Sequence, residues 1–344
     1  KANFHVIDID PNFRIADETE STLMKLEALN DLFEAQYEKE SNEEFMRLLE
    51  SYGGNRDDQR LMDMVLELYT FIQSSPWPEE WLNQNTEILK AEGINDFGDT
   101  IWGKVLLNNA EIELTGMKDM LERSVEIIKN AKGLENYLPI YQEDLANIMD
   151  HLSIIKNEIS DNKWNMLCES LSNNEFARLK SASRDADKDK QEEVKAIRND
   201  VKERIKKLKN NTISNNSEEL LRDVRELYPQ MKCLSELAIG LSTLYLEKKK
   251  KKSAMDFNDL EHYCVEILTQ RTEDGSIKPS DTALAYREKF HEIMVDEYQD
   301  SNLVQEIIIN MVSKADENKP NIFMVGDVKQ SIYKFRQARP ELFM

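Results

Sequence analysis

Two adjacent carboxylates follow a short apolar run near the end of the sequence. Ile293-Met294-Val295 is typical of a strand, and Asp296 and Glu297 come directly after it. A carboxylate at the tip of a buried strand can hold Mg²⁺, usually through water. A second carboxylate beside it can orient and deprotonate a water molecule for in-line attack on a γ-phosphate. Strands also end in acidic residues that only face solvent, so this pattern alone leaves both interpretations open.

A second polar segment, Gly326–Arg336, follows the next apolar run, Asn321–Val325. The side-chain amide of Gln330 can contact a γ-phosphate or the attacking water. Phe335 and Arg336 can offer a stacking face and a cation to single-stranded nucleic acid. This segment is therefore the candidate for a link between phosphate chemistry and a nucleic acid.

The elements that must position these side chains form a strand–helix–strand pattern. The apolar runs 292–295 and 321–325 are short and continuous, and the residues 303–311 between them have helical spacing. Buried strands joined by a helix are typical of a parallel α/β unit. Ligands of such sheets bind at the carboxyl ends of the strands, where Asp296 and Asp327 lie.

The motif DEYQDSN, followed by GDVKQSIYKFRQARPELF, resembles motifs II and III of superfamily 1 helicases of the UvrD/RecB type. Together with MDFNDLEHY upstream and FRIADETE near the start, these motifs look like the AddA (RexA) family, the helicase–nuclease subunits of the AddAB/RexAB complexes. The resemblance is dense over 255–344 and covers the first 20–35 residues more loosely.

The resemblance implies a role for each motif position. Asp296 would associate with Mg²⁺ through water, and Glu297 would be the catalytic carboxylate for ATP hydrolysis. Gln330 would couple the γ-phosphate to the DNA site. The remaining motif positions would contact single-stranded DNA or support the structure; they are Phe335 and Arg336 for DNA, and Tyr333 and Asp327 for support.

The resemblance also implies a function for a longer parent protein. That parent would be an ATP-dependent 3′→5′ DNA helicase and exonuclease that processes double-strand breaks for recombinational repair. It would use ATP and Mg²⁺, bind single- and double-stranded DNA, and work with an AddB/RexB subunit. Both ends of this chain look like cuts through that parent, so we expect the fragment to be inactive alone, with no cofactor bound.

A phosphate-binding loop is the part of such a motor that we do not find. Residues Gly98–Lys104 satisfy GxxxxGK, but Val105 stands where a Ser or Thr hydroxyl should meet Mg²⁺. No buried strand precedes this segment, whereas a phosphate cradle needs a strand, a glycine loop and a helix N-terminus. We interpret the match as coincidental and expect a loop between helices.

The formal charge of −21 and the pI near 4.8 exclude a generic basic coat for nucleic acid. Any DNA contact must therefore come from a local patch. The five-lysine run Lys248–Lys252 has two interpretations, a solvated helix end that favours cations, or a patch that faces phosphate.

Ten glycines and eight prolines in 344 residues predict long helices. Short β-like runs at 6–9 and 13–15 precede a first helix that Ser21 and Thr22 can cap. A polar stretch, 181–190, should be a loop. Apolar residues spaced three and four apart over 194–208 predict a helix of a long antiparallel arm, with a homodimeric coiled coil as the alternative.

We therefore predict a mostly α fold with a small α/β part: a helical 1B-like insertion in a partial P-loop (RecA-like) helicase domain. Residues 1–20 would be the first piece of the RecA-like domain 1A, 21–254 the inserted arm, and 255–344 the return into 1A with motifs II and III. No membrane segment, signal peptide, disulfide framework or zinc site is apparent, so we expect a cytoplasmic protein. The alternatives are a UvrD-like helicase without a nuclease and a non-catalytic helical interaction module.

Overall fold

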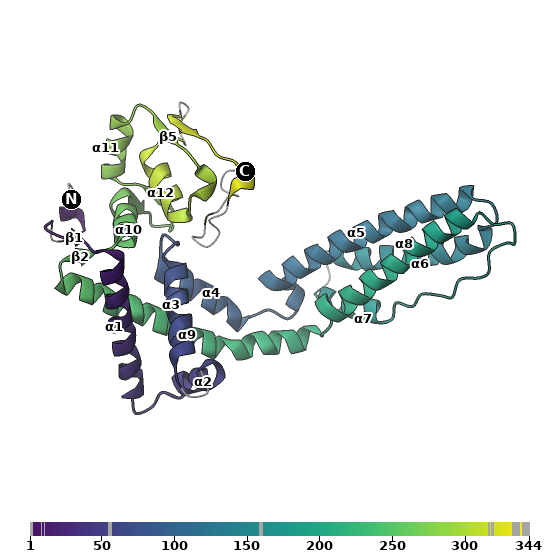
Figure 1. Ribbon diagram of the computed structural model, residues 1–344, viewed down its shortest axis with the longest axis horizontal. Coiled ribbons are helices and arrows are strands. Elements are labelled where there is room, and N and C mark those ends of the chain that lie inside the picture. The colour runs from purple at the N-terminus through teal and green to yellow at the C-terminus, as the bar shows by residue number, and fades with distance from the viewer. Residues whose placement is uncertain are drawn as a thin grey trace. The chain divides into compact units, whose positions relative to one another are not determined.

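The chain is mostly helical, as the sequence predicts, with three small two-stranded sheets in its described part (Figure 1). The computed structural model describes residues 3–7, 9, 11–53, 57–157, 161–315, 317, 320–331 and 338. The α-helices are α1 (Glu18–Tyr37), α2 (Glu43–Tyr52), α3 (Gln59–Ile72), α4 (Pro78–Glu87), α5 (Ile101–Asn130), α6 (Leu138–Lys156), α7 (Lys163–Ser172), α8 (Lys188–Lys207), α9 (Ser217–Lys251), α10 (Phe257–Leu268), α11 (Asp281–Lys289) and α12 (Leu303–Val312). The strands are β1 (Arg14–Ile15), β2 (Ala254–Met255), β3 (Thr269–Arg271), β4 (Ile277–Pro279), β5 (Ile293–Val295) and β6 (Ile322–Met324).

The chain divides into two compact units. Unit 1 consists of Lys1–Glu87 and Tyr228–Met344, and unit 2 consists of Ile88–Leu227. Unit 2 covers the middle of the predicted insertion, whereas the flanking parts of that insertion belong to unit 1. The predicted domain boundaries at 20 and 254 stay a prediction.

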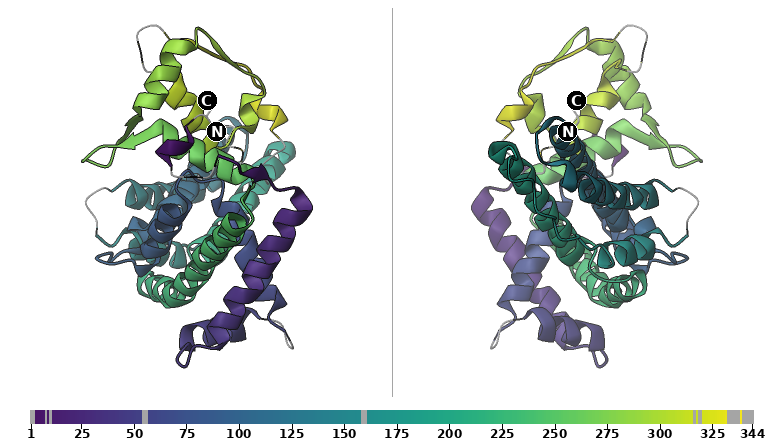
Figure 2. Two further views of the ribbon diagram at one scale, coloured as in Figure 1. Left: turned by 90° about the vertical axis from the view of Figure 1, so that its left-hand side faces the viewer. Right: turned by 90° about the vertical axis from the view of Figure 1, so that its right-hand side faces the viewer.

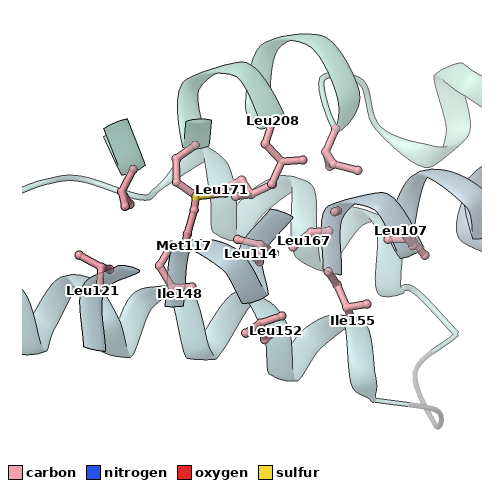
Figure 3. Packing of buried hydrophobic residues seen from close by; sticks show 14 of the residues in the cluster. Leu107, Leu114, Met117, Leu121, Ile148, Leu152, Ile155, Leu167, Leu171 and Leu208 are labelled. Atoms are coloured by element: carbon pink, nitrogen blue, oxygen red, sulfur yellow. The ribbon is translucent and has the colours of Figure 1, made fainter. Parts of the chain in front are cut away.

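Unit 2 is a helical bundle in which α5 packs against α6 and α8. Its core contains aliphatic side chains from these helices and from α7, many of which Figure 3 shows, together with aromatic side chains such as Tyr141 and Trp164. The apolar stripe predicted on 194–208 joins this core, because Val194, Val201, Ile205 and Leu208 are buried in it. The stripe is thus covered by its own chain, which favours the helical arm over the homodimeric coiled coil.

A buried ion pair crosses the same bundle. The Arg198 Nε of α8 donates to Asp144 Oδ2 of α6 at 2.5 Å, and its Nη2 donates to the Ala177 carbonyl at 2.8 Å. Ala177 lies in the irregular segment 173–187, which is longer than the loop predicted at 181–190 and ends where α8 begins. Arg198 therefore fastens this segment to the helices.

Unit 1 packs α1, α2 and α3 against the part of α9 that follows residue 228; Figure 2 shows α1 beside α9. The cap predicted for α1 was wrong. Asp17 is the N-cap, with its Oδ1 accepting from the Glu20 N–H at 2.8 Å, whereas Ser21 is buried within the helix. The carboxylate sits one turn earlier than the hydroxyls and satisfies a free N–H group of the first turn.

The prediction of a β-like run at 6–9 was also wrong. Residues Phe4–Val6 form a 3₁₀ turn instead, and Val6 is exposed. The strand of this region is β1, which pairs in parallel with β2, with Ile15 opposite Met255. Apolar β-branched residues alone do not make a strand without a partner for their backbone groups.

The five-lysine run fits neither of its two interpretations completely. Lys249 is buried and paired with the carboxylates of Asp256 and Asp259, and Lys248 pairs with Asp31 at 2.7 Å. Lys250, Lys251 and Lys252 are exposed. Two lysines of the run are therefore paired with carboxylates, and three are solvated.

The prediction of a loop at the GxxxxGK match was wrong. The match spans a 3₁₀ turn (Phe97–Asp99) and the first turn of α5. The Gly103 N–H donates to Thr100 Oγ1 at 2.9 Å, and a Cβ on Gly103 would overlap the Phe97 carbonyl. The glycine thus allows close packing at a capped helix start.

Within the described residues, no helix has the length and apolar character needed to cross a membrane.

Candidate functional site

The predicted site is built on the parallel pair β5 and β6. Ile293 lies opposite Ile322 and Val295 opposite Met324. The two segments that follow the strands stay paired. The Val325 N–H donates to the Val295 carbonyl at 2.9 Å, and the Tyr298 N–H donates to the Val325 carbonyl at 2.9 Å. Both strands therefore deliver their following residues to one edge of the sheet, as predicted.

The expectation that these strands are buried was wrong for one face of the pair. Met294 and Phe323, which face each other in the register, are 73% and 64% exposed. The alternate residues of both strands are half-buried, and α12 packs nearby against α10 and α11. A two-stranded sheet with helices on one face leaves its other face open to solvent.

Asp296 and Glu297 are both exposed at this edge. Asp296 Oδ1 accepts from the Glu297 N–H at 2.9 Å. Glu297 has φ 51° and ψ 41°, in the left-handed region that residues with a side chain rarely adopt. Such strained positions gather at functional sites, where the surrounding contacts hold them. At Glu297 the backbone therefore leaves the extended conformation of β5.

A shallow hollow of about 390 Å³ lies beside these carboxylates. Asp296, Glu297, Asp300 and Ser301 contribute to its lining. Asp300 Oδ1 is buried and has no hydrogen-bond partner among the described residues. Carboxylate oxygens are the ligands that Mg²⁺ prefers. The structure holds no cluster of three or more metal-type side chains within its described part. Mg²⁺ does not need one, since it keeps several waters and binds one or two carboxylates together with substrate phosphates.

Gln299 is a site residue that the sequence analysis missed. Its side chain is 1% exposed; the Nε2 donates to Glu297 Oε2 at 2.6 Å and the Oε1 accepts from the Asp327 N–H at 2.9 Å. The signal was its place inside DEYQDSN, two residues after Glu297. A polar side chain in a tight turn between two strand ends is well placed to join them.

A series of hydrogen bonds connects Glu297 to Gln330 through Gln299 and Asp327. From Gln299 they pass to the backbone of Asp327, and Asp327 Oδ2 accepts from Gln330 Nε2 at 3.0 Å. Asp327 Oδ1 also caps the 3₁₀ turn Val328–Gln330 by accepting from the Lys329 N–H. The structure thus brings together the four predicted site residues that it describes. The other three, Tyr333, Phe335 and Arg336, lie outside the described residues.

Comparison with known proteins gives one family over the whole chain. Residues 1–344 match the family model of the UvrD/REP helicase N-terminal domain. The A subunit of the ATP-dependent helicase/nuclease of Acetivibrio thermocellus is 60% identical over 344 residues, which are 100% of this chain and 27% of that protein. Proteins of the same name from Ruminiclostridium cellulolyticum and Clostridium acetobutylicum are 49% and 45% identical over the whole chain, which covers 27% and 28% of their lengths. The chain thus spans little more than a quarter of the curated relatives it matches.

Proposed function

Because this chain belongs to the UvrD/REP helicase N-terminal domain family, we propose that it is the part of a DNA motor that carries the hydrolytic carboxylates. The whole protein would be an ATP-dependent 3′→5′ helicase and exonuclease that processes double-strand breaks for recombinational repair. The names of the relatives support a helicase joined to a nuclease, rather than a helicase alone. The observation that carries the proposal is the carboxylate pair Asp296 and Glu297 at the open edge of parallel strands.

In this proposal Glu297 orients the attacking water and accepts its proton. A positioned base of this kind contributes roughly 10²- to 10⁴-fold to a rate. Asp296 would hold Mg²⁺ through water, with Asp300 as a further oxygen close by. When bound with ATP, Mg²⁺ would neutralise charge on the phosphate oxygens. The exposed position of both carboxylates leaves them accessible to a nucleotide.

Gln330 would connect hydrolysis to DNA. It lies at the end of the hydrogen-bonded path from Glu297, and the segment after it contains Phe335 and Arg336. An aromatic ring and a guanidinium next to each other suit stacking on the bases of single-stranded DNA. Movement of that segment on DNA would then reach the phosphate site through Gln330.

Unit 2 would be a 1B-like arm that contacts duplex DNA or an AddB/RexB partner. Although the chain is acidic, residues 176–209 contain twelve Lys and Arg against seven Asp and Glu. Lys206 and Lys207, at the end of α8, are exposed. Phosphate contacts need only such a local excess of cations. Apart from Arg198, which is buried against Asp144, the cations of this segment would supply the local contacts that an acidic chain requires for duplex DNA.

The decisive test uses the full-length protein with its partner subunit. We expect Glu297→Gln to lower DNA-stimulated ATP hydrolysis by roughly 10²-fold or more, while ATP binding is kept. Glu292→Gln is the matched control, because Glu292 is exposed at the other end of the same strand. A Glu297→Gln protein that hydrolyses ATP at the normal rate would contradict the proposal.

The 344-residue chain alone should not turn over ATP, since its only GxxxxGK match is a helix start. A phosphate-release assay with single-stranded DNA tests this. Robust turnover that Glu297→Gln abolishes would show that the chain needs no further phosphate-binding loop.

A further inference from the structure

The buried amide of Gln299 joins the two loops of the site. One end donates to Glu297 Oε2 at 2.6 Å, and the other accepts from the Asp327 N–H at 2.9 Å. Its own backbone carbonyl accepts from Ser331 Oγ at 3.4 Å. The side chain therefore sits between the carboxylate after β5 and the loop after β6, with both polar atoms of its amide engaged.

Only one orientation of this amide satisfies both neighbours. The NH₂ group must face the Glu297 carboxylate, because an amide oxygen there would face a second acceptor. The oxygen must face the Asp327 N–H, because an NH₂ group there would face a second donor. The Glu297 side chain is exposed, and the Gln299 Nε2 donates to its carboxylate at 2.6 Å. The Gln299 amide thus fixes the carboxylate in one place.

The loop after β6 is in close contact with this amide. A Cβ on Gly326 would overlap Gln299 Oε1, and it would lie 3.2 Å from the backbone nitrogens of Gln299 and Tyr298. The glycine is therefore required by close approach of the two loops. Any displacement of residues 326–327 must move the amide, and with it the partner of Glu297.

We propose that Gln299 is a positioning residue that holds the Glu297 carboxylate for hydrolysis only while the 326–327 loop is seated against it. This inference rests on the proposed function of Glu297. It assigns to Gln299 the physical link between the carboxylate and the segment that contains Gln330. Gln299 need not touch the nucleotide, since it acts through Glu297.

Two substitutions separate the two ends of the amide. Gln299→Glu keeps an acceptor for the Asp327 N–H but places a carboxylate against Glu297, whereas Gln299→Met has similar length and loses both hydrogen bonds. In the full-length protein, both should lower kcat for DNA-stimulated ATP hydrolysis by roughly 10- to 100-fold, the range expected for a misplaced reacting group. KM for ATP should stay within about twofold, because only the catalytic carboxylate is displaced.

Gly326→Ala tests the other side of the same contact. It should lower kcat in the same way, and the double variant Gln299→Met/Gly326→Ala should be no slower than the worse single variant. Non-additivity is expected of residues that act through one contact. If the two effects on kcat multiply instead, the link between the loops is wrong.

Hydrogen–deuterium exchange gives a readout that does not depend on activity. The Asp327 amide should exchange faster in Gln299→Met than in the parent, and should stay protected in Gln299→Glu, which retains its acceptor. Gln59→Glu is the matched control: Gln59 Nε2 donates to Asp63 Oδ1 at 2.7 Å on α3, so it replaces an amide beside a carboxylate outside the site. It should leave both kcat and the exchange of Asp327 unchanged.

The outcomes distinguish this inference from the proposed function. If Glu297→Gln abolishes hydrolysis but both Gln299 variants keep normal kcat, the positioning role is wrong and the catalytic role of Glu297 stands. If Glu297→Gln is fully active, the proposed function fails first. If Gln59→Glu lowers kcat as much as Gln299→Glu does, the loss reflects general destabilisation and the inference is overturned.

Discussion

Lys249, near the end of α9, donates from Nζ to Asp259 Oδ1 in the first turn of α10 at 2.5 Å. Lys249 is 3% exposed, and its ammonium lies 4.2 Å from the centre of the Tyr245 ring. Asp256 also faces it, at 3.4 Å, and accepts from the Tyr245 hydroxyl. One buried cation thus serves two carboxylates of the MDFNDLEHY segment and joins α9 to α10.

We expect Lys249→Met to lower the free energy of unfolding by about 3–5 kcal/mol, because it leaves two buried carboxylates without their cation. Urea unfolding of the chain measures this. Lys250→Met is the control from the same run of lysines; its side chain is exposed, so the change should stay within about 0.5 kcal/mol. Equal losses for the two variants would show that Lys249 matters only as part of a basic helix end.

Unit 2 should lose stability in mild acid through His151. Burial lowers the pKa of His151, whose Nδ1 contacts Ser170 Oγ at 2.8 Å and whose Nε2 contacts Asn174 Oδ1 at 3.2 Å. The unfolded chain then binds this proton at a higher pH than the folded chain does. The free energy of unfolding should therefore fall as the pH drops below about 6.5, by up to about 1.4 kcal/mol per pH unit.

His151→Gln should remove that part of the pH dependence, since glutamine keeps a donor and an acceptor but does not titrate in this range. Urea unfolding between about pH 8 and pH 5.5 compares it with His291→Gln, in which an exposed histidine is replaced. A slope that persists in His151→Gln and disappears in His291→Gln would contradict the assignment.

The start of α5 offers a test of the GxxxxGK match. Gly103→Ala should cost about 1–3 kcal/mol of unfolding free energy, because the added methyl group meets the Phe97 carbonyl. Lys104→Ala should have little effect on stability, since Lys104 is exposed, and none on the ATPase of the full-length protein. Loss of ATPase with normal stability in Lys104→Ala would restore the phosphate-loop interpretation.

Local patterns were enough to predict the elements of the site. The apolar runs before Asp296 and Gly326, and the helical spacing between them, correctly indicated parallel strands joined by α12. Parallel pairing then required both loops to meet at one edge. The exposure of Met294 and Phe323 could not be predicted in this way, because the residues of a strand do not determine which other elements pack on each face of the sheet.

Contacts between distant or neighbouring polar groups were harder to predict. Lys249 looked like any member of a basic run, and only the fold brings Asp256 and Asp259 next to it. Gln299 was not predicted because its role comes from two hydrogen-bond partners on different loops, which only the fold brings together. Asp17 is the N-cap of α1 because the helix begins at Glu18, one turn before Ser21, and the position of a helix start is not fixed by residue type alone.

The parallel pairing of β1 with β2 has a consequence for biosynthesis. Ile15 emerges from the ribosome before α1 to α9 are made, and its partner Met255 emerges only after them. Helices with neighbours close in sequence can form during that interval, whereas β1 keeps an open edge until the later strand arrives. Closing so long a loop is slow rather than prohibitive, because its entropic cost grows only with the logarithm of its length. The growing chain must therefore protect the unpaired β1 until α1 to α9 and β2 have been synthesised.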